Sequence, residues 1–291
     1  MSTNKITKAV IPCAGMGTRF LPITKSLPKE MLPIVDTPVL KYIVDEASKS
    51  GISDVLLINN RSKPAIEHFF KDKSFVDKLR DLGKHDEAEL LATVNGNVEI
   101  SFAYQDEPKG SGHAVLCAEK FVGKQAFALA WGDDLIESVK PVIGQLTALY
   151  DVYQVSVIGV QPIDTDEIVK YGVIQVGEQD GKIFKCNKIV EKPTLDKVPS
   201  RLAALGRYVL HPEIFEEIRA TASLHAQGEM PLTSALNSLA QKSRLVAHSF
   251  EGTRFDMGDK FGSLTASIYF GRKRFGRELD DYLKKLLIAD N

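Results

Sequence analysis

The chain has 291 residues, of which 44% are hydrophobic and 26% are charged, a balance typical of a globular protein with one large or two ordinary α/β domains. A formal net charge of -1 argues against a general affinity for nucleic acid or for a membrane surface, so we expect neither as a partner. No run of residues approaches the roughly 18 apolar positions of a transmembrane helix. Cys13, Cys117 and Cys186 are far apart and odd in number, which fits a reducing cytoplasm better than a disulfide framework.

Strand-like and helix-like segments alternate along the first half of the chain. Short apolar runs predict strands at residues 8–13, 54–59, 97–105 and 126–131. Helical spacing of apolar residues predicts helices at 38–51, 111–123 and 139–152, with two or three short amphipathic helices across 63–94. This alternation predicts a parallel sheet with helices on both of its faces.

The pattern changes after residue 162. Two antiparallel strands are predicted across 171–193, joined at an Asp-Gly turn, and a strand and a helix follow at 202–218. A late strand is predicted at 245–252, and residues 260–288 are mostly helical and rich in Lys and Arg. The predicted fold class is therefore α/β: a Rossmann-like, mixed, mainly parallel central sheet flanked by helices, with a β-rich second part and C-terminal helices. Since there is no repeat and no obvious linker, we expect a single domain over residues 1–291.

The stretch "KAVIPCAGMGTRFLPITKSLPKEMLP", which begins at residue 8, has the pattern of an anion-binding loop after a strand. A dinucleotide-binding turn would use Gly15 and Gly17, with Asp36 as the ribose-binding acid, but Phe20 replaces the third glycine and Pro22 interrupts the helix. The spacing of a P-loop is absent. Two interpretations remain beside the dinucleotide turn. The first is a triphosphate-binding loop that uses its own cations. The second is a solvated surface loop. The candidate cations are Arg19, Lys25 and Lys29.

A longer pattern, "AGMGTRFLP" followed by "PKEMLPIVDTPVLKY", resembles the signature of the sugar-nucleotide pyrophosphorylases, G-x-G-T-R and then P-K-x-x-L-P. Residues 61–94 look like the helical insert of the bacterial members that act on UTP and glucose 1-phosphate. The resemblance implies a glycosyltransferase-A-like nucleotidyltransferase fold, with a nucleotide-binding part at 1–160, a sugar-phosphate-binding part at 161–259 and a C-terminal helical segment at 260–291. The nucleotide contacts that it implies in this loop are Ala14, Gly15, Gly17, Thr18, Lys25 and Glu30.

A second glycine-rich break, "YQDEPKGSGHAV", lies between a predicted strand and a predicted helix. The amide of Gln105 can both donate to and accept from a base edge, and Gly110 leaves room for a flat ring. Taken alone, the segment is equally well explained as a plain turn. By resemblance to the family, Gln105 and Gly110 contact uracil. We interpret His113 as a structural residue rather than as an acid or base.

Two carboxylates, Asp133 and Asp134, end the apolar strand of "AFALAWGDDLI". At the carboxyl end of a parallel strand they suit Mg²⁺, which takes few protein oxygens, although helix capping by either residue is the alternative. By resemblance, Asp133 is a metal ligand, Asp256 of "FDMGDK" is the second, and Asp134 is a supporting or nucleotide-ribose contact. Trp131 departs from the family, which more often has Leu or Pro at this place.

The predicted hairpin carries the motifs "KYGVIQV" and "KIVEKP". An exposed Glu-Lys pair on a strand is ordinarily only a solvated surface. By resemblance these are the sugar-phosphate motifs, so Gly172 and Glu191 are expected to contact the sugar and Lys192 the sugar phosphate.

The reaction implied by the resemblance joins UTP and glucose 1-phosphate into UDP-glucose and pyrophosphate, by direct in-line attack with Mg²⁺ as cofactor. Since a phosphate nucleophile is already anionic, no general base is needed, and Arg19, Lys29 and Lys192 are expected to supply charge stabilisation. Three alternatives remain open: another sugar 1-phosphate or dTTP as substrate, a non-catalytic nucleotide-binding regulatory protein, and a dinucleotide-dependent oxidoreductase. Family members are usually oligomers, so we expect a homo-dimer or homo-tetramer.

Overall fold

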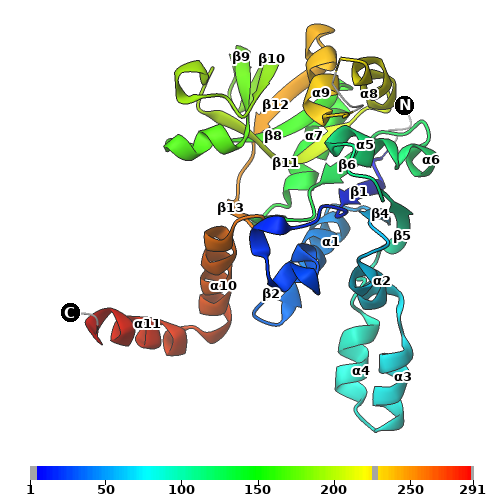
Figure 1. The fold of residues 1–291 in the computed structure, drawn as a ribbon, viewed down its shortest axis with the longest axis vertical. Coiled ribbons are helices and arrows are strands. Elements are labelled where there is room, and N and C mark those ends of the chain that lie inside the picture. Colours follow the sequence, from blue (N-terminus) through cyan, green and yellow to red (C-terminus); the bar gives the residue numbers. More distant parts are fainter. Residues whose placement is uncertain (1–4, 225–228, 290–291) are drawn as a thin grey trace.

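The computed structural model describes residues 5–224 and 229–289 of the chain. Its centre is a nine-stranded sheet with the strand order β5-β4-β1-β6-β11-β8-β12-β10-β9 (Figure 1). The strands of this sheet are β1 (Lys8–Pro12), β4 (Asp54–Asn59), β5 (Glu99–Tyr104), β6 (Phe127–Ala130), β8 (Ser156–Pro162), β9 (Gly172–Asp180), β10 (Ile183–Glu191), β11 (Leu202–Leu210) and β12 (Leu245–Ser249). Two short antiparallel ribbons pair β2 (Pro33–Ile34) with β3 (Thr37–Pro38) and β7 (Asp134–Glu137) with β13 (Thr253–Asp256).

The sheet is mixed, as predicted, and its two halves differ. Strands β5, β4, β1 and β6 run parallel to one another. Strand β11 is antiparallel to β6 and β8, β12 is parallel to β8, and the hairpin β9–β10 joins through an antiparallel pairing of β10 with β12. The parallel half therefore contains the N-terminal strands, and the hairpin continues the same sheet.

Helices cover both faces of the sheet. In β1, Ala9 and Ile11 point into one hydrophobic core and Val10 into the other, because successive side chains of a strand face opposite ways. Burial on both faces explains why these strands are apolar throughout. The first core is covered by α1 (Val39–Lys49), α7 (Val142–Tyr153) and α10 (Lys260–Phe275), and the second by α5 (Ser111–Leu116), α6 (Glu119–Val122), α8 (Ile214–Ala222) and α9 (Leu232–Gln241).

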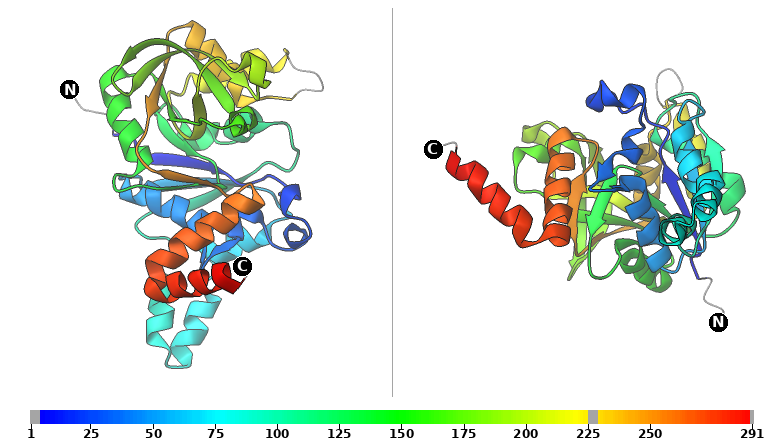
Figure 2. Two further views of the ribbon diagram at one scale, coloured as in Figure 1. Left: turned by 90° about the vertical axis from the view of Figure 1, so that its left-hand side faces the viewer. Right: turned by 90° about the horizontal axis from the view of Figure 1, so that it is seen from below.

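Two helical segments extend beyond these layers. The predicted helices of residues 63–94 are α2 (Pro64–Lys71), which adds Ile66 and Phe70 to the first core, and α3 (Ser74–Asp81) and α4 (His85–Ala92), which form an arm with its own small core of Val76, Leu79 and Ala88. Helix α11 (Arg277–Ala289) turns away from α10 and from the body of the molecule (Figures 1 and 2). Among the helices of the described residues, none has the length and apolar character needed to span a membrane.

The parallel strands bring the motifs of the sequence to one edge of the sheet. The glycine loop follows β1, Gln105 follows β5 and Asp133 follows β6, so all three come after the carboxyl ends of parallel strands. Carboxyl ends of parallel strands are where open α/β sheets bind ligands. Asp134 belongs to the next strand, β7, and lies opposite Asp256 of β13 in the ladder. This pairing brings the late "FDMGDK" motif beside the carboxylates that follow β6.

Candidate active site

The loop after β1 has no long helix behind it. Gly17 has a left-handed backbone with φ of 67°, and its carbonyl accepts a hydrogen bond of 2.8 Å from Thr24 Oγ1. Single 3₁₀ turns follow at Thr18–Phe20, Ile23–Lys25 and Lys29–Met31. A dinucleotide fold would place the N-terminus of a long helix here. The loop is therefore built as a folded, side-chain-rich segment, which fits the triphosphate interpretation better than the dinucleotide one.

A buried ion pair holds this loop from beneath. The Lys63 ammonium donates to the Cys13 carbonyl at 2.8 Å and to Glu30 Oε2 at 3.0 Å. Glu30 is 1% exposed, and its burial raises the pKa of its carboxyl group while Lys63 opposes that shift. Because Cys13 opens the loop and Glu30 lies near its end, Lys63 joins the two ends and ties them to the start of α2. Such a buried position favours a role for Glu30 in holding the loop.

The first of two cavities, which we call the loop cavity, has a volume of about 440 Å³. Ala14, Gly15 and Lys25 line it from the glycine loop, and Lys63 and Gln105 line it from the segments that follow β4 and β5. Three of the predicted nucleotide contacts of the loop and the predicted base contact Gln105 thus lie around one space, whereas Gly17, Thr18, Glu30 and Gly110 do not line it.

The turn that carries Gly110 is closely packed. Gly110 has φ of 92°, and a Cβ atom there would lie 2.9 Å from the Met230 carbonyl oxygen. Gly112 N donates to the same oxygen at 2.6 Å, and Met230 N donates to the Lys109 carbonyl at 2.8 Å. A side chain at Gly110 or Gly112 would break this contact, so these glycines serve the packing of the turn as well as any approach of a ring.

The second space, the hairpin cavity, has a volume of about 500 Å³. It brings together side chains from the glycine loop, the ends of β6 and β13, and the hairpin. The predicted site residues that line it are Arg19, Asp133, Asp134, Gly172, Glu191, Lys192 and Asp256. Among the described residues that line this cavity there is no histidine or cysteine. The lining is suited to hold anions between cations and carboxylates, and it offers no nucleophilic triad.

Two carboxylates and one guanidinium group converge on Gly258. A Cβ atom built on Gly258 would lie 3.0 Å from Asp133 Oδ2, 3.1 Å from Asp256 Oδ1 and 3.7 Å from Arg19 Nη1. Only glycine leaves this space free. Two carboxylates that face one point, with room for phosphate oxygens and water, match the sparse protein ligation of Mg²⁺. The described residues contain no group of three or more His, Cys, Asp and Glu that could hold a metal ion.

Lys29 reaches this centre from the glycine loop. Its ammonium contacts the Asp133 carboxylate. Burial disfavours the charge of Lys29, but Asp133 and Glu30 outweigh that effect and raise the pKa of the ammonium above its usual value. Lys29 therefore stays cationic at neutral pH, as a phosphate-binding residue requires.

A buried network fixes the position of Asp256. The Arg254 guanidinium pairs with Asp134, lies 3.5 Å from Asp256 Oδ2 and stacks 4.7 Å from the ring centre of Tyr171. Tyr171 Oη donates to Asp256 Oδ2 at 3.0 Å. Burial raises the pKa of the Asp134 carboxyl, against the opposing charge of Arg254. This pairing favours a supporting role for Asp134.

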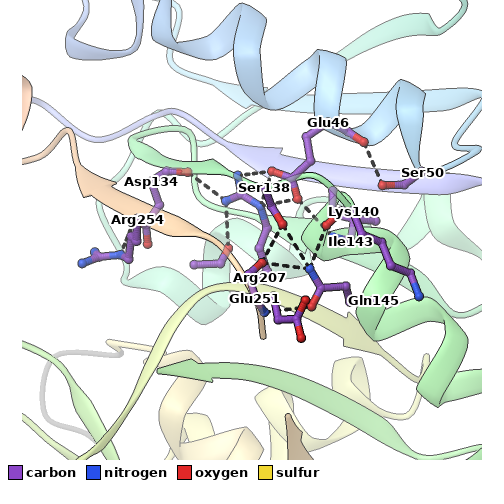
Figure 3. A network of polar contacts seen from close by, with 11 residues as sticks. Glu46, Ser50, Asp134, Ser138, Lys140, Ile143, Gln145, Arg207, Glu251 and Arg254 are labelled. Atoms are coloured by element: carbon purple, nitrogen blue, oxygen red, sulfur yellow. Dashed lines mark hydrogen bonds and ion pairs between the residues drawn. The ribbon is translucent and has the colours of Figure 1, made fainter. Parts of the chain in front are cut away.

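The network continues beneath the site (Figure 3). The fully buried Arg207 donates to the Asp134 carbonyl at 2.9 Å and to both carboxylate oxygens of Glu46, which comes from α1. A buried charge is tolerated when it is paired and hydrogen-bonded in this way. The backbone at Asp134 is thereby tied to the first helix of the fold.

The hairpin residues lie on the far wall of the hairpin cavity. Glu191 Oε2 accepts from Thr233 Oγ1 at 2.8 Å, and a Cβ on Gly172 would lie 3.2 Å from the same oxygen. Lys192 has φ of 44°, and its N–H donates to the Tyr171 carbonyl at 3.0 Å. The left-handed backbone at Lys192 turns the chain at the end of β10, and its exposed side chain lines the cavity.

The structure does not bring every predicted residue to one point. Lys25 lines the loop cavity and Arg19 the hairpin cavity, while Thr18 is exposed at the start of the first 3₁₀ turn. Several supporting residues are missing from the sequence-based prediction, and Lys63 and Arg254 are the two that contact predicted site residues through ion pairs. A signal existed for Arg254, since residues two apart on a strand share a face and Arg254 precedes Asp256 by two. Lys63 lies before a proline at a helix start and gives no comparable signal.

Comparison with known proteins identifies the family of the chain. Residues 8–268 match the family model described as nucleotidyl transferase. A UTP–glucose-1-phosphate uridylyltransferase, YngB of Bacillus subtilis strain 168, is 44% identical over 271 residues, 93% of this chain and 91% of that protein.

Solved structures superpose over most of the chain. A UTP-bound UGPase from Acinetobacter baumannii has a TM-score of 0.86 at 32% identity, covering 97% of this chain and 99% of that one. A UDP-glucose pyrophosphorylase complexed with UDP-glucose has a TM-score of 0.82 at 37% identity, covering 92% and 99%. The chain therefore belongs to the nucleotidyl transferase family.

Proposed function

We propose that this protein is a UTP–glucose-1-phosphate uridylyltransferase, which converts UTP and glucose 1-phosphate into UDP-glucose and pyrophosphate. Support comes from relatives of that name, 41–44% identical over nearly the whole chain. The observation that carries the proposal is the convergence of Arg19, Asp133 and Asp256 on Gly258. This convergence lies in the hairpin cavity, which the sugar-phosphate motifs line from the other side.

The proposed chemistry is a direct displacement at phosphorus. A phosphate oxygen of glucose 1-phosphate forms a bond to the α-phosphorus of UTP, and the bond from that phosphorus to the bridging oxygen breaks as pyrophosphate leaves. The nucleophile is anionic at neutral pH, so the reaction needs no proton acceptor. Since anions must approach one another, charge stabilisation and positioning provide the catalysis.

We assign the roles by location. Arg19 and Lys29 hold the β- and γ-phosphates, and Lys192 holds the incoming phosphate. Asp133 and Asp256 would hold Mg²⁺, which when bound neutralises phosphate charge. Gly172 and Glu191 contact the sugar, and Gln105 and Gly110 the base. The remaining nucleotide contacts are assigned to the glycine loop, at Ala14, Gly15, Gly17, Thr18, Lys25 and Glu30, and to Asp134 at the start of β7.

We also propose that residues 1–291 act as one domain. Its parts are nucleotide-binding (1–160), sugar-phosphate-binding (161–259) and C-terminal helical (260–291). The shared sheet supports this division into parts of one unit, because β8 pairs with both β11 and β12. The cysteines are free thiols, which fits the reducing cytoplasm that we propose as its location.

Helix α11 supports the proposal of a homo-dimer or homo-tetramer. It packs on α10, where Leu279 meets Gly271, and Arg272 pairs with Asp280. Beyond this contact the helix exposes large apolar side chains, with Tyr282 59% and Ile288 74% accessible. An exposed apolar side on a projecting helix is typical of a surface that packs against another subunit.

A matrix of nucleoside triphosphates against sugar 1-phosphates, scored by pyrophosphate release, tests this function. We expect the highest kcat/KM for UTP with glucose 1-phosphate. A higher kcat/KM for dTTP or for galactose 1-phosphate would change the assigned substrate, but the assigned reaction would still be nucleotidyl transfer. No pyrophosphate from any pair, with tight UTP binding, would favour a non-catalytic regulatory protein. Binding of NAD(H) without UTP would favour an oxidoreductase.

A further inference from the structure

The side-chain amide of Gln105 has a fixed orientation. Its Nε2 lies 3.0 Å from the Gly110 carbonyl oxygen and 3.0 Å from His113 Nδ1. An amide nitrogen has two N–H groups, so both are used inside the protein. Gln105 is 9% exposed, and its main-chain N–H donates to the Asn59 carbonyl at 2.8 Å. These contacts therefore fix both the position of the Gln105 side chain and the orientation of its amide.

This arrangement requires His113 to accept a hydrogen bond. Nδ1 accepts only in the neutral imidazole whose proton is on Nε2. Burial, and then the charge of Lys109, lower the pKa of His113 and so favour the neutral ring. If the Gln105 amide were turned by half a rotation, its oxygen would face the lone pair of His113 Nδ1 and the Gly110 carbonyl. The amide oxygen would then face two other hydrogen-bond acceptors and no donor, which is unfavourable.

The orientation leaves the oxygen of the amide for a ligand. Gln105 lines the loop cavity, and no donor from the described residues is hydrogen-bonded to its Oε1. The side chain therefore offers a hydrogen-bond acceptor, not a donor, to a group bound in the cavity. Uracil carries a donor, N3–H, between two carbonyl oxygens. Cytosine carries an acceptor at N3 beside an amino group, so its pattern is the reverse.

We propose that His113 is a positioning residue that fixes the Gln105 amide and thereby sets a preference for UTP over CTP. The proposal rests on the proposed function, in which the base of the nucleotide occupies the loop cavity. A freely rotating amide could pair with either base by turning over. A locked acceptor pairs with N3–H of uracil and meets the lone pair of N3 in cytosine. Sites built around a fixed hydrogen bond discriminate more strongly than apolar pockets do.

A matched pair of variants tests the role of His113. His113→Leu removes the acceptor, whereas His113→Asn has nearly the same size as leucine and keeps an acceptor oxygen near the place of Nδ1. We expect His113→Leu to narrow the ratio of kcat/KM for UTP to that for CTP by about tenfold, and His113→Asn to retain the wild-type ratio within about threefold. Calorimetric binding of UTP and CTP should change in the same way, and circular dichroism and melting temperature report whether each variant is folded.

The outcomes separate this proposal from its alternatives. The proposal is wrong if folded His113→Leu keeps the wild-type ratio of kcat/KM for UTP to that for CTP. An equal loss of affinity for UTP and CTP would contradict it too, because a change in packing alone weakens the binding of both nucleotides. Should the leucine variant fail to fold, His113→Ala provides the same removal of the acceptor. If the wild type releases no pyrophosphate from UTP, the proposed function fails, but the binding ratio of UTP to CTP still tests the orientation of Gln105.

Discussion

The Lys29 ammonium contacts the Asp133 carboxylate and so joins the glycine loop to the end of β6. The two residues are 104 positions apart in the sequence. In the proposed reaction, Lys29 meets the leaving phosphates and Asp133 the metal, so the contact holds each group close to its expected partner. The site thus brings its opposite charges together through the fold itself, which reduces the reorganisation needed when substrates bind.

Arg19 tests the role of charge stabilisation. We expect Arg19→Ala to lower kcat by about 100- to 1,000-fold, the usual effect of losing one donor that stabilises charge in the transition state. Steady-state kinetics with saturating UTP and glucose 1-phosphate measure the effect. Arg80→Ala, an exposed arginine of the helical arm, is the control and should keep wild-type kcat. A raised KM with unchanged kcat in Arg19→Ala would mean that Arg19 binds substrate without aiding the chemical step.

The two carboxylates beside Gly258 test the metal site. Asp133→Asn and Asp256→Asn should each shift the Mg²⁺ titration of activity to higher concentrations by at least about tenfold, because a neutral amide is a poorer ligand for a hard cation. Chelation with EDTA should abolish activity of the wild type, and added Mg²⁺ should restore it. Asp36→Asn is the control, since Asp36 is exposed and pairs with Arg274. Titration curves that coincide with that of the wild type would exclude these residues as ligands.

Lys63 tests the support of the loop. Lys63→Met leaves Glu30 buried without its partner, so we expect the free energy of unfolding to fall by about 3–5 kcal/mol, measured by urea denaturation. The double variant Lys63→Met, Glu30→Gln should recover much of this loss.

The loss in the free energy of unfolding that Lys63→Met causes should also depend on pH. Burial already raises the pKa of Glu30 above its ordinary 4.5, and removing Lys63 raises it further. The folded state then binds this proton more tightly than the unfolded state, so stability falls as pH rises above about 4.5. The loss should therefore be smaller near pH 4.5 than at pH 7. A loss that is independent of pH would contradict a charged Glu30 as its cause.

Much of this site was predictable from local sequence. The Gly-x-Gly after an apolar strand, the carboxylates at the end of another and the Asp-Gly turn at Gly181 each depend on a few neighbouring residues. The structure places all three as the pattern indicates, and Gly181 has the expected positive φ of 57°.

Contacts between distant segments were not predictable in the same way. The pairing of β7 with β13 brings Asp134 beside Arg254. The ion pair between Lys63 and Glu30 joins the residue before α2 to the glycine loop. Such partners depend on tertiary packing, which periodicity does not encode. The single helix predicted at 111–123 is in fact α5 and α6, interrupted after Leu116. Helix α9 is absent from the sequence-based prediction, although Leu232, Leu236 and Leu239 have helical spacing, and small polar residues between them weaken that signal.

Helix α11 tests the proposed assembly. Tyr282→Lys with Ile288→Lys replaces two exposed apolar side chains of this helix by charges, and we expect the variant to sediment as a monomer while the wild type sediments as a dimer or tetramer. Leu90→Lys is the control, because Leu90 is 73% exposed and lies on α4 of the helical arm. Equal sedimentation of wild type and double variant would remove α11 from the interface. Because the side chains of Tyr282 and Ile288 are both exposed in the single chain, the double substitution should leave the fold of the subunit unchanged.

The central claim is the transfer of the uridylyl group of UTP, which contains the α-phosphorus, to glucose 1-phosphate, and the fate of that phosphorus tests it directly. Incubation of the purified full chain with Mg²⁺, glucose 1-phosphate and UTP labelled in the α-phosphate should place the label in UDP-glucose, with one unlabelled pyrophosphate released for each product molecule. Without glucose 1-phosphate, no label should become bound to the protein and no pyrophosphate should appear. Label that stays in UTP when both substrates are present, or that becomes attached to the protein, would contradict direct uridylyl transfer.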